Sequence, residues 1–474
     1  MSNFRLGFIV LTAVMISCQH RTQEAVLACD FQSILPTGND VECGYIMVPE
    51  NHDQPDGKKI KIAYAVLHAR DSTTKAYPVI YLSGGPGGSA ISERTLNSWY
   101  DDAFRENRDV ILLDQRGIGY SSALPNMYKE LYSIMARDVS AEEEQNLIGD
   151  LLAGYSQMCK DRQIDLSNYN SFQNARDVGA LMDHLGYGKY NIYGVSYGTR
   201  LARVTQDLFP DKLNAVILNS PNPIQGDMLV DRLKSYSLAL SRVFDYCNKN
   251  PECHAANPSL EEDYFKAINA MKEKPLLLNI DGDSVYLNAQ DGIFFVRRLL
   301  YGVNSRTDIP VLIQEFLQGG GPLITDLVRD EYADDYNFAM WFSVERHEMF
   351  DSNNTLEIVS QVYDSLPLLP AKLGLFQAAY LNLGSLHDSG ADAQKKAFQL
   401  SSVPTLITVN QFDPVTPPEN GRIMMATLSQ GQLFVLDEGG HGGGDMECKD
   451  RVMIDFMDNP HGPLDASCLN VYKE

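Results

Sequence analysis

The chain has 474 residues, of which 44% are hydrophobic, and this length and composition are typical of a globular protein with more than one structural unit. Its 62 acidic and 39 basic residues give a formal net charge of -23 at pH 7. This charge argues against nucleic acid as a partner, because phosphate binding needs a cationic surface. An acidic surface suits cationic ligands, or it simply keeps the protein solvated.

Residues 1–18 have the pattern of an export signal. Arg5 supplies positive charge, residues 6–16 form an apolar run too short to span a membrane, and Ser17 precedes Cys18. The sequence Met-Ile-Ser-Cys at residues 15–18 also resembles the lipobox of bacterial lipoproteins, in which the cysteine is acylated. We expect an exported protein of the periplasm or cell envelope, held to the membrane only by a lipid on Cys18. An ordinary cleaved signal peptide is the alternative.

Apolar runs of strand length recur along the chain, and most of them are continuous rather than alternating. Continuous runs are typical of parallel strands that are buried on both faces of a sheet. A helical pattern at residues 174–185 places its apolar side chains on one face. Strands that alternate with helices indicate the α/β class. The predicted strands are residues 59–67, 77–82, 109–113, 190–193, 215–218, 405–409 and 433–436.

The alternation of strands and helices breaks after residue 219. From there to about residue 399 helical patterns and charge dominate, and strand patterning resumes at Val403. We therefore predict a first part of an α/β core at residues 19–219, an inserted, mainly helical cap at residues 220–400, and a second part of the core at residues 401–474. The core would be a mostly parallel sheet flanked by helices.

The sequence Gly-Val-Ser-Tyr-Gly at residues 194–198 follows a predicted strand and precedes a helical pattern. It matches the nucleophile elbow Gly-x-Ser-x-Gly, in which a serine sits on a strained strand-to-helix turn and the glycines relieve crowding. A short pattern of this kind also occurs in ordinary turns. The flanking strand and helix favour Ser196 as a nucleophile.

A serine hydroxyl needs a base and an orienting carboxylate before it attacks, and in this fold the acid and then the histidine follow the serine along the chain. Asp413 ends a predicted strand and precedes a proline-rich loop, while His441 lies in a glycine loop after the next strand. We predict Asp413 as the acid and His441 as the base. Weaker rivals for these roles are His461, His347, His387, Asp437 and Glu438.

Attack on a carbonyl creates an oxyanion, which backbone N–H groups usually stabilise. The amide of Tyr197, directly after the nucleophile, is the first predicted donor. The second is Gly85, in the loop Ser-Gly-Gly-Pro-Gly-Gly at residues 83–88 that follows a predicted strand. The same loop could hold a phosphate, but it lacks the Lys-Ser/Thr ending of a P-loop.

Cys18 apart, the chain has seven further cysteines, and export would permit disulfides. The short spacings favour pairing Cys29 with Cys43, Cys247 with Cys253, and Cys448 with Cys468, which leaves Cys159 as the odd thiol. A metal site is the rival interpretation, but the sequence contains no Cys-x-x-Cys pair and no His-Glu-x-x-His. We expect neither a metal nor an organic cofactor.

With these motifs the chain resembles the proline iminopeptidase and tripeptidyl aminopeptidase family of α/β-hydrolases. The resemblance runs from about residue 43 to residue 468, and its spaced cysteines look like the C-terminal segment of tripeptidyl aminopeptidases. It implies the α/β-hydrolase fold and a serine peptidase that acts on peptide N-termini. The motifs are Gly-Gly-Pro-Gly at residues 84–87, Asp-Gln-Arg-Gly-Ile-Gly-Tyr-Ser at residues 114–121, Gly-Val-Ser-Tyr-Gly-Thr at residues 194–199, and the loops of Asp413 and His441.

The chain departs from the family pattern at Ser83, where proline iminopeptidases commonly have His. This difference argues against a strict specificity for proline. Related enzymes bind the amino group of the substrate with acids of the cap, and residues 341–348 resemble the cap helix that supplies them. The resemblance therefore implies Glu345 and Glu348 as ligands of a substrate ammonium, which needs a paired carboxylate when buried. A solvated, charged helix face is the alternative.

The sequence thus predicts a serine aminopeptidase that binds short peptides beneath a cap and cleaves them through an acyl-enzyme. It would release a single residue, a dipeptide or a tripeptide. An esterase or amidase for a non-peptide acyl substrate is the main alternative, because the same machinery serves both. A lipoprotein that uses the fold only for binding is the remote one.

Overall fold

The computed structural model describes residues 29–38, 40–71, 73, 76–225, 228–333, 336–349, 356–373, 397–437, 439–443 and 446–472, with only the backbone at 228–229 and 356–359. The predicted export signal and Cys18 lie outside these residues. The main strands are β1 (Val41–Pro49), β2 (Lys59–Leu67), β3 (Val79–Leu82), β4 (Val110–Leu113), β5 (Tyr190–Val195), β6 (Leu213–Asn219), β9 (Thr405–Asn410) and β10 (Gly431–Leu436).

These strands form one eight-stranded sheet in the order β1-β2-β4-β3-β5-β6-β9-β10. The pairs β1·β2 and β2·β4 are antiparallel, whereas every pair from β4 to β10 is parallel. The predicted mostly parallel sheet is confirmed. The sequence missed β1, whose side chains alternate between buried and more exposed positions because it is the edge strand.

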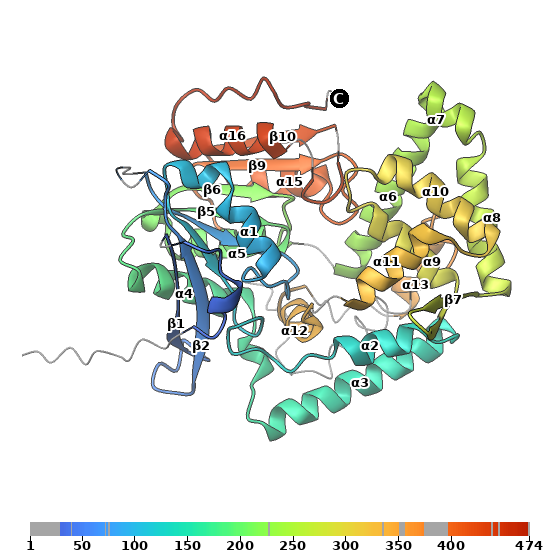
Figure 1. Ribbon diagram of the computed structural model, residues 1–474, viewed down its shortest axis with the longest axis horizontal. Coiled ribbons are helices and arrows are strands. Elements are labelled where there is room, and N and C mark those ends of the chain that lie inside the picture. The colour runs from blue at the N-terminus through green and yellow to red at the C-terminus, as the bar shows by residue number, and fades with distance from the viewer. Residues whose placement is uncertain are drawn as a thin grey trace, which may run out of the picture.

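Helices cover both faces of the sheet (Figure 1). The helices outside the cap insertion are α1 (Glu93–Tyr100), α2 (Tyr128–Met135), α3 (Ala141–Asp161), α4 (Ser171–His184), α5 (Tyr197–Leu208), α15 (Pro418–Met425) and α16 (Met446–Asp458). Val79 of β3 packs in the hydrophobic cluster shared with α1 and α16, and its neighbour Ile80 packs in the cluster shared with α4 and α5. Successive residues of a strand point to opposite faces, so both faces of a continuous apolar run are buried.

Between β6 and β9 the chain leaves the sheet and forms a mainly helical cap with one hairpin (Figure 1). Its elements are α6 (Met228–Lys249), α7 (Pro251–Ala256), α8 (Leu260–Glu273), β7 (Leu276–Ile280), β8 (Asp283–Leu287), α9 (Ala289–Leu299), α10 (Ser305–Gln318), α11 (Pro322–Ala333), α12 (Phe338–Glu348) and α13 (Leu356–Asp364). The sequence did not predict the β7–β8 hairpin, which is only half buried.

Two helices from the first part of the chain lie with this cap. The segment α2–α3 leaves the core between β4 and α4, and Tyr286 of β8 donates its amide to the carbonyl of Ala136 at 3.1 Å. Gln290 of α9 also bonds Glu144 of α3. The predicted division assigned residues 19–219 wholly to the core, and it therefore misplaced these two helices. Tyr128 and Tyr132 of α2 also lie beside the ring of Phe338 in the cap helix α12.

The structure pairs Cys29 with Cys43, Cys247 with Cys253, and Cys448 with Cys468, which are the pairs that the spacing favoured. Cys159 is buried and lies outside any disulfide. Disulfides persist in oxidising compartments, so these bonds are typical of an exported protein. Over the part of the chain that the structure describes, no helix has the length and apolar character needed to cross a bilayer.

Candidate active site

Ser196 sits on a strained turn between β5 and α5. Its backbone has φ 56° and ψ −123°, a left-handed conformation that is uncommon for any residue except glycine. The Ser196 amide donates to the Asn219 carbonyl of β6 at 3.0 Å, and the Ser196 carbonyl accepts from the amide of Thr199 at 2.9 Å. The predicted strand-to-helix turn is therefore present, and neighbouring elements hold it.

Gly198 permits the close approach that this turn requires. A Cβ atom on Gly198 would lie 1.9 Å from the carbonyl oxygen of Leu82 at the end of β3. Real Cβ atoms do not come this close to a backbone oxygen, so α5 can begin against β3 only with glycine here. The contact brings the turn beside the loop that follows β3.

Asp413 and His441 come from the loops after β9 and β10, and the structure brings them together. Nδ1 of His441 lies 2.9 Å from Oδ2 of Asp413. The Asp413 carboxylate also accepts from the amides of Val415 at 2.9 Å and Thr416 at 2.8 Å, and from the Thr416 hydroxyl at 2.7 Å. This carboxylate is fully buried and its position is fixed by four donors.

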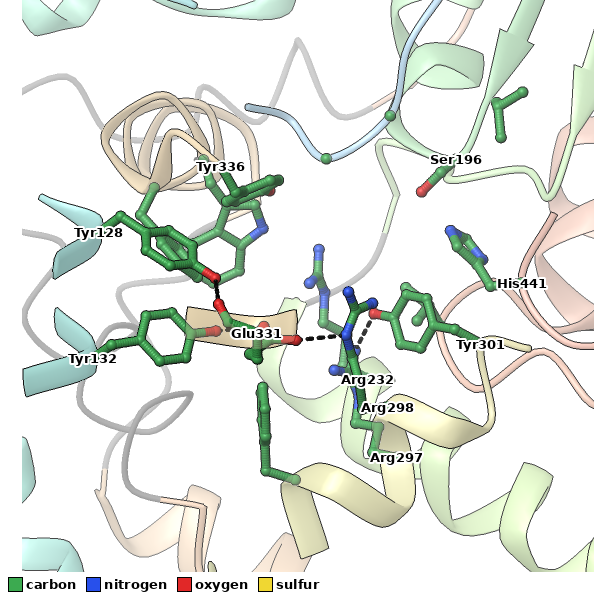
Figure 2. A pocket seen from close by; sticks show the side chains of 17 residues that line it. Tyr128, Tyr132, Ser196, Arg232, Arg297, Arg298, Tyr301, Glu331, Tyr336 and His441 are labelled. Carbon is green, nitrogen blue, oxygen red and sulfur yellow. Dashed lines mark hydrogen bonds and ion pairs between the residues drawn. The ribbon is translucent and has the colours of Figure 1, made fainter. Parts of the chain in front are cut away.

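Burial by itself would raise the pKa of Asp413, but its neighbours outweigh that effect. The adjacent His441 and the amides of Thr416 and Val415 favour the charged form, so the pKa of Asp413 lies below its ordinary value of 3.8. Asp413 is thus a carboxylate at neutral pH. Figure 2 shows His441 beside Ser196, at the same end of one pocket.

The glycine loop after β3 lies directly against Ser196. Gly84 and Gly85 line the same pocket as Ser196 and His441. The hydroxyl of Ser83 donates to the carbonyl of Gly88 at 2.7 Å, which closes the loop on itself. The amide of Tyr197 is the first N–H of α5, and such an N–H has no acceptor within its own helix. Both predicted oxyanion donors therefore belong to elements that surround Ser196.

The motif at residues 114–121 is hydrogen-bonded to the chain segment that follows β3. Asp114 accepts hydrogen bonds from the amides of Ala90 and Ile91, at 2.8 and 3.0 Å, and from the amide of Tyr120 at 2.8 Å. Gln115 donates to the carbonyl of Ser83 at 2.9 Å. These fully buried side chains tie the loop after β4 to the loop after β3.

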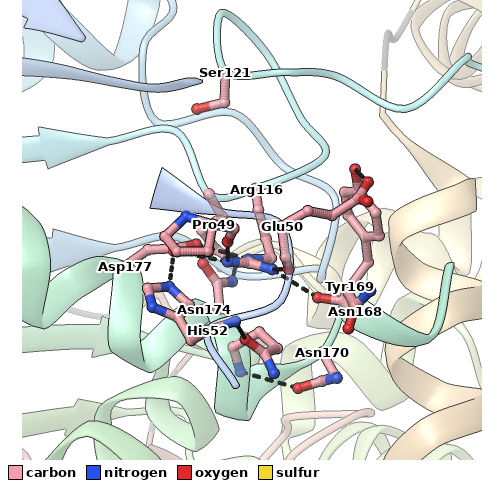
Figure 3. A network of polar contacts seen from close by, with 12 residues as sticks. Pro49, Glu50, His52, Arg116, Ser121, Asn168, Tyr169, Asn170, Asn174 and Asp177 are labelled. Atoms are coloured by element: carbon pink, nitrogen blue, oxygen red, sulfur yellow. Dashed lines mark hydrogen bonds and ion pairs between the residues drawn. The ribbon is translucent and has the colours of Figure 1, made fainter. Parts of the chain in front are cut away.

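Arg116 of the same motif forms a buried network on the other side (Figure 3). Its guanidinium makes two bonds of 2.7 Å to Asp177 of α4, and it donates to the carbonyls of Glu50 at 2.6 Å and Asn168 at 2.8 Å. His52 lies 2.7 Å from the same Asp177 carboxylate. The motif therefore acts as a structural joint between β1, β4 and α4.

A cavity of ≈ 330 Å³ lies between the core and the cap, and Ser196 and His441 line it. This is the size range of small-molecule sites in proteins. Aromatic side chains from the cap and from α2 form much of its wall, among them Tyr128, Phe294 and Trp341. Its ionisable lining residues other than the histidine and the tyrosines, among the residues described, are Arg232, Arg297, Arg298 and Glu331.

Glu345 and Glu348, the predicted ligands of the substrate ammonium, do not line this pocket. Both lie on α12 and are buried, at 0% and 2% exposed. Glu348 accepts from the amide and hydroxyl of Ser171, at 2.6 and 2.9 Å, and pairs with Arg200 at 3.1 Å. Glu345 pairs with Arg232 at 3.1 Å. The family resemblance placed the two acids on a cap helix, but it did not show that they pack inward.

The carboxylate that does line the pocket, Glu331, escaped the sequence prediction. Glu331 lies near the end of α11, where it accepts from the Tyr132 hydroxyl and pairs with Arg298 at 2.7 Å. The backbone carbonyl of Glu331 accepts from Tyr128. Neither α11 nor α2 carries a motif, so no local pattern marks these residues.

Comparison with known families identifies the class. A family model described as alpha/beta hydrolase fold matches residues 77–267, and one described as TAP-like protein matches residues 385–468. Together with the strand order, these matches show that the chain is an α/β-hydrolase-fold protein with a TAP-like C-terminal segment. The resemblance stated from the sequence is confirmed at this level.

Similar proteins carry hydrolase and peptidase names. The tripeptidyl aminopeptidase of Streptomyces lividans is 30% identical over 38% of this chain and 35% of its own length. The proline iminopeptidase of Aeromonas sobria is 28% identical over 38% of this chain and 37% of that protein. The putative hydrolase YuaR of Escherichia coli is 22% identical over 90% of this chain and 87% of that protein. The chain thus spans about a third of the two named peptidases, and the matches support a hydrolase.

The buried pair of Arg116 and Asp177 predicts a large effect on stability. Arg116→Ala should lower the free energy of unfolding by about 3–5 kcal/mol, because it leaves the Asp177 charge buried without the guanidinium. Arg176→Ala on the same helix as Asp177 is the control, since its ion pair with Asp53 is exposed and should contribute less than about 1 kcal/mol. Urea unfolding of both variants measures the difference, and equal losses would contradict the structural role.

The lowered pKa of Asp413 predicts an acid-dependent contribution to stability. A folded pKa below the unfolded value means that the ionised carboxylate stabilises the fold above about pH 4, and that this contribution disappears as the pH falls through the folded pKa. The stability advantage of wild type over Asp413→Asn should therefore shrink on acidification. Unfolding measured between neutral and acidic pH tests this, and a difference that does not change with pH would contradict it.

Proposed function

We propose that the protein is a serine aminopeptidase that hydrolyses short peptides from their free N-terminus. The observation that carries the chemistry is the convergence of three chain segments on one pocket: Ser196 on its strained turn, and His441 held by the buried Asp413. The peptidase names of the relatives support the choice of substrate.

In this proposal the reaction follows the serine hydrolase scheme. Ser196 attacks the scissile carbonyl while Nε2 of His441 takes its proton, and His441 then returns the proton to the leaving amine. Asp413 holds Nδ1 of His441, which fixes the ring and its tautomer. The amides of Gly85 and Tyr197 stabilise the oxyanion. Water then hydrolyses the acyl-enzyme by the same steps.

We assign recognition of the substrate ammonium to Glu331 in place of Glu345 and Glu348. Glu331 lies at the opposite end of the pocket from Ser196 (Figure 2). A peptide that reaches from one to the other would have its N-terminus beside a carboxylate and its scissile bond at the serine. A buried ammonium needs such a partner.

The second candidate function is an esterase or amidase for a non-peptide acyl group. The aromatic wall of the pocket favours it, since Phe294, Phe338 and Trp341 could hold an apolar acyl chain as well as a peptide. The remote alternative is a protein that binds ligands without catalysis. Attachment of the exported chain to a membrane through a lipid on Cys18 also remains our proposal.

Labelling with a fluorophosphonate separates catalysis from mere binding. Wild type should label, and Ser196→Ala should not, because the reagent reacts with an activated serine. Ser133→Ala, which alters an exposed serine of α2, is the control and should label like wild type. Folded wild type that does not label would contradict the hydrolase proposal, and labelling of Ser196→Ala would contradict the nucleophile.

Chromogenic peptides with free and acetylated N-termini test the aminopeptidase proposal. Acetylation should lower kcat/KM by about tenfold or more, because it removes the charge that Glu331 would bind. Glu331→Gln should reduce this preference, whereas Asp330→Asn, an exposed acid on the same helix, should retain it. Indifference to acetylation, with a simple acyl ester turned over readily, would favour the esterase instead.

A further inference from the structure

Three arginine side chains line the pocket that holds Ser196, and they come from two cap helices. Arg232 belongs to α6, and Arg297 and Arg298 belong to α9. Figure 2 shows them between Glu331 on one side and Ser196 with His441 on the other. A substrate that spans the pocket would therefore pass over the guanidinium groups.

The contacts of these arginines keep their guanidinium groups at the pocket. Arg232 pairs with Glu345 at 3.1 Å and lies over the ring of Trp341, 5.3 Å from its centroid. Arg297 donates to the hydroxyl of Tyr301 at 3.0 Å. Side chains that are held in place lose little freedom when a ligand binds, which favours a preorganised site.

Arg298 is the most accessible member of the cluster. It pairs with Glu331 at 2.7 Å, and its side chain remains 40% exposed. Glu331 holds one edge of the Arg298 guanidinium, and the rest of this group can contact a ligand in the pocket. A guanidinium has five N–H donors, so one such pair does not use all of them.

The electrostatics of the cluster favour an anion. Among the pocket-lining residues described, three carry a guanidinium and one carries a carboxylate, and adding the buried Glu345 still leaves a net positive charge. Burial lowers the pKa of Arg297, the neighbouring Tyr301 raises it in part, and the positive charges of Arg232 and Arg298 lower it. A bound anion would relieve this repulsion.

The positive pocket also contrasts with the rest of the chain. The formal net charge of the protein is -23, so a concentration of arginines is a local exception rather than part of a basic surface. A cationic cleft of this kind raises the local concentration of an anionic substrate that the remaining surface would repel. Guanidinium groups match the planar geometry of carboxylates.

We propose that Arg232, Arg297 and Arg298 bind a carboxylate of the substrate, so that the enzyme prefers acidic peptides. This rests on the proposed function. Because the arginines lie between Glu331 and Ser196, the carboxylate belongs to a Glu or Asp side chain between the N-terminus and the scissile bond. The terminal carboxylate of a short peptide has the same chemistry but would lie on the leaving side of Ser196.

The test compares matched chromogenic amides of peptides with free N-termini that carry Glu or Gln on the acyl side. The expected kcat/KM is about tenfold or more higher for Glu than for Gln, as for other charge-assisted hydrogen bonds, and the ratio should fall as salt increases. Arg297→Gln and Arg298→Gln should bring the ratio toward one. Arg297→Lys should keep part of it, because it retains the charge.

Arg329→Gln is the matched control. Arg329 lies on α11, pairs with Asp281 and Asp326 and does not line the pocket, so the variant should keep the Glu over Gln ratio of wild type. If the buried Arg297 proves necessary for folding, Arg298→Gln remains informative. Thermal unfolding and fluorophosphonate labelling show whether each variant is folded and has an active serine.

Two further comparisons distinguish failure of the arginine-site proposal from failure of the aminopeptidase proposal. Glutaryl and butyryl aryl esters carry an acyl chain with and without a carboxylate, so a preference for glutaryl in an enzyme that ignores peptides would refute the aminopeptidase and support the arginine site. Equal turnover of Glu and Gln peptides, and of both esters, would overturn the arginine site alone. A preference only for a free over an amidated C-terminus would overturn the acyl-side assignment.

Discussion

The backbone turn at Ser196 is the constraint on which the rest of the site depends. A serine does not adopt φ 56° by local preference, so its neighbours must hold it. The carbonyl of Asn219 at the end of β6 accepts a hydrogen bond from the Ser196 amide, and the amide of Thr199 donates to the Ser196 carbonyl. Gly198 lets α5 lie in close contact with Leu82 of β3. These restraints come from the ends of β6 and β3 and from the first turn of α5. The conformation of Ser196 at the pocket therefore depends on the assembled sheet, and the pentapeptide alone would not produce it.

Most of the core could be predicted from the sequence because its signals are local. Ser196 and Asp413 follow buried apolar runs, His441 follows the partly buried β10, and parallel strands bring their carboxyl ends to one edge of the sheet. Order along the chain then selected Asp413 and His441 among many acids and histidines, and the structure brings these two side chains together. The strand β1 escaped because it lies at the edge, where one face meets fewer neighbours and the continuous apolar pattern is lost.

The cap could not be predicted in the same way. The resemblance of residues 341–348 to a cap helix did not show which elements would pack around Glu345 and Glu348, and the structure pairs these buried acids with Arg232 and Arg200. The cluster of Arg232 and Arg298 is assembled from α6 and α9, and Glu331 comes from α11. Their proximity follows from tertiary packing, for which no spacing in the sequence is diagnostic.

The helices α2 and α3 connect the cap to the core at a second place along the chain. A cap formed by a single insertion would be joined to the sheet only at its two ends, after β6 and before β9, and could rotate about these two connections. Here a second excursion, between β4 and α4, is bonded to it through Tyr286 and Ala136. The cap is therefore linked to the core at its own two ends and also through the α2–α3 segment, which leaves the core after β4 and returns to it at α4. An outward movement of the cap would have to break the hydrogen bonds between the cap and the α2–α3 segment.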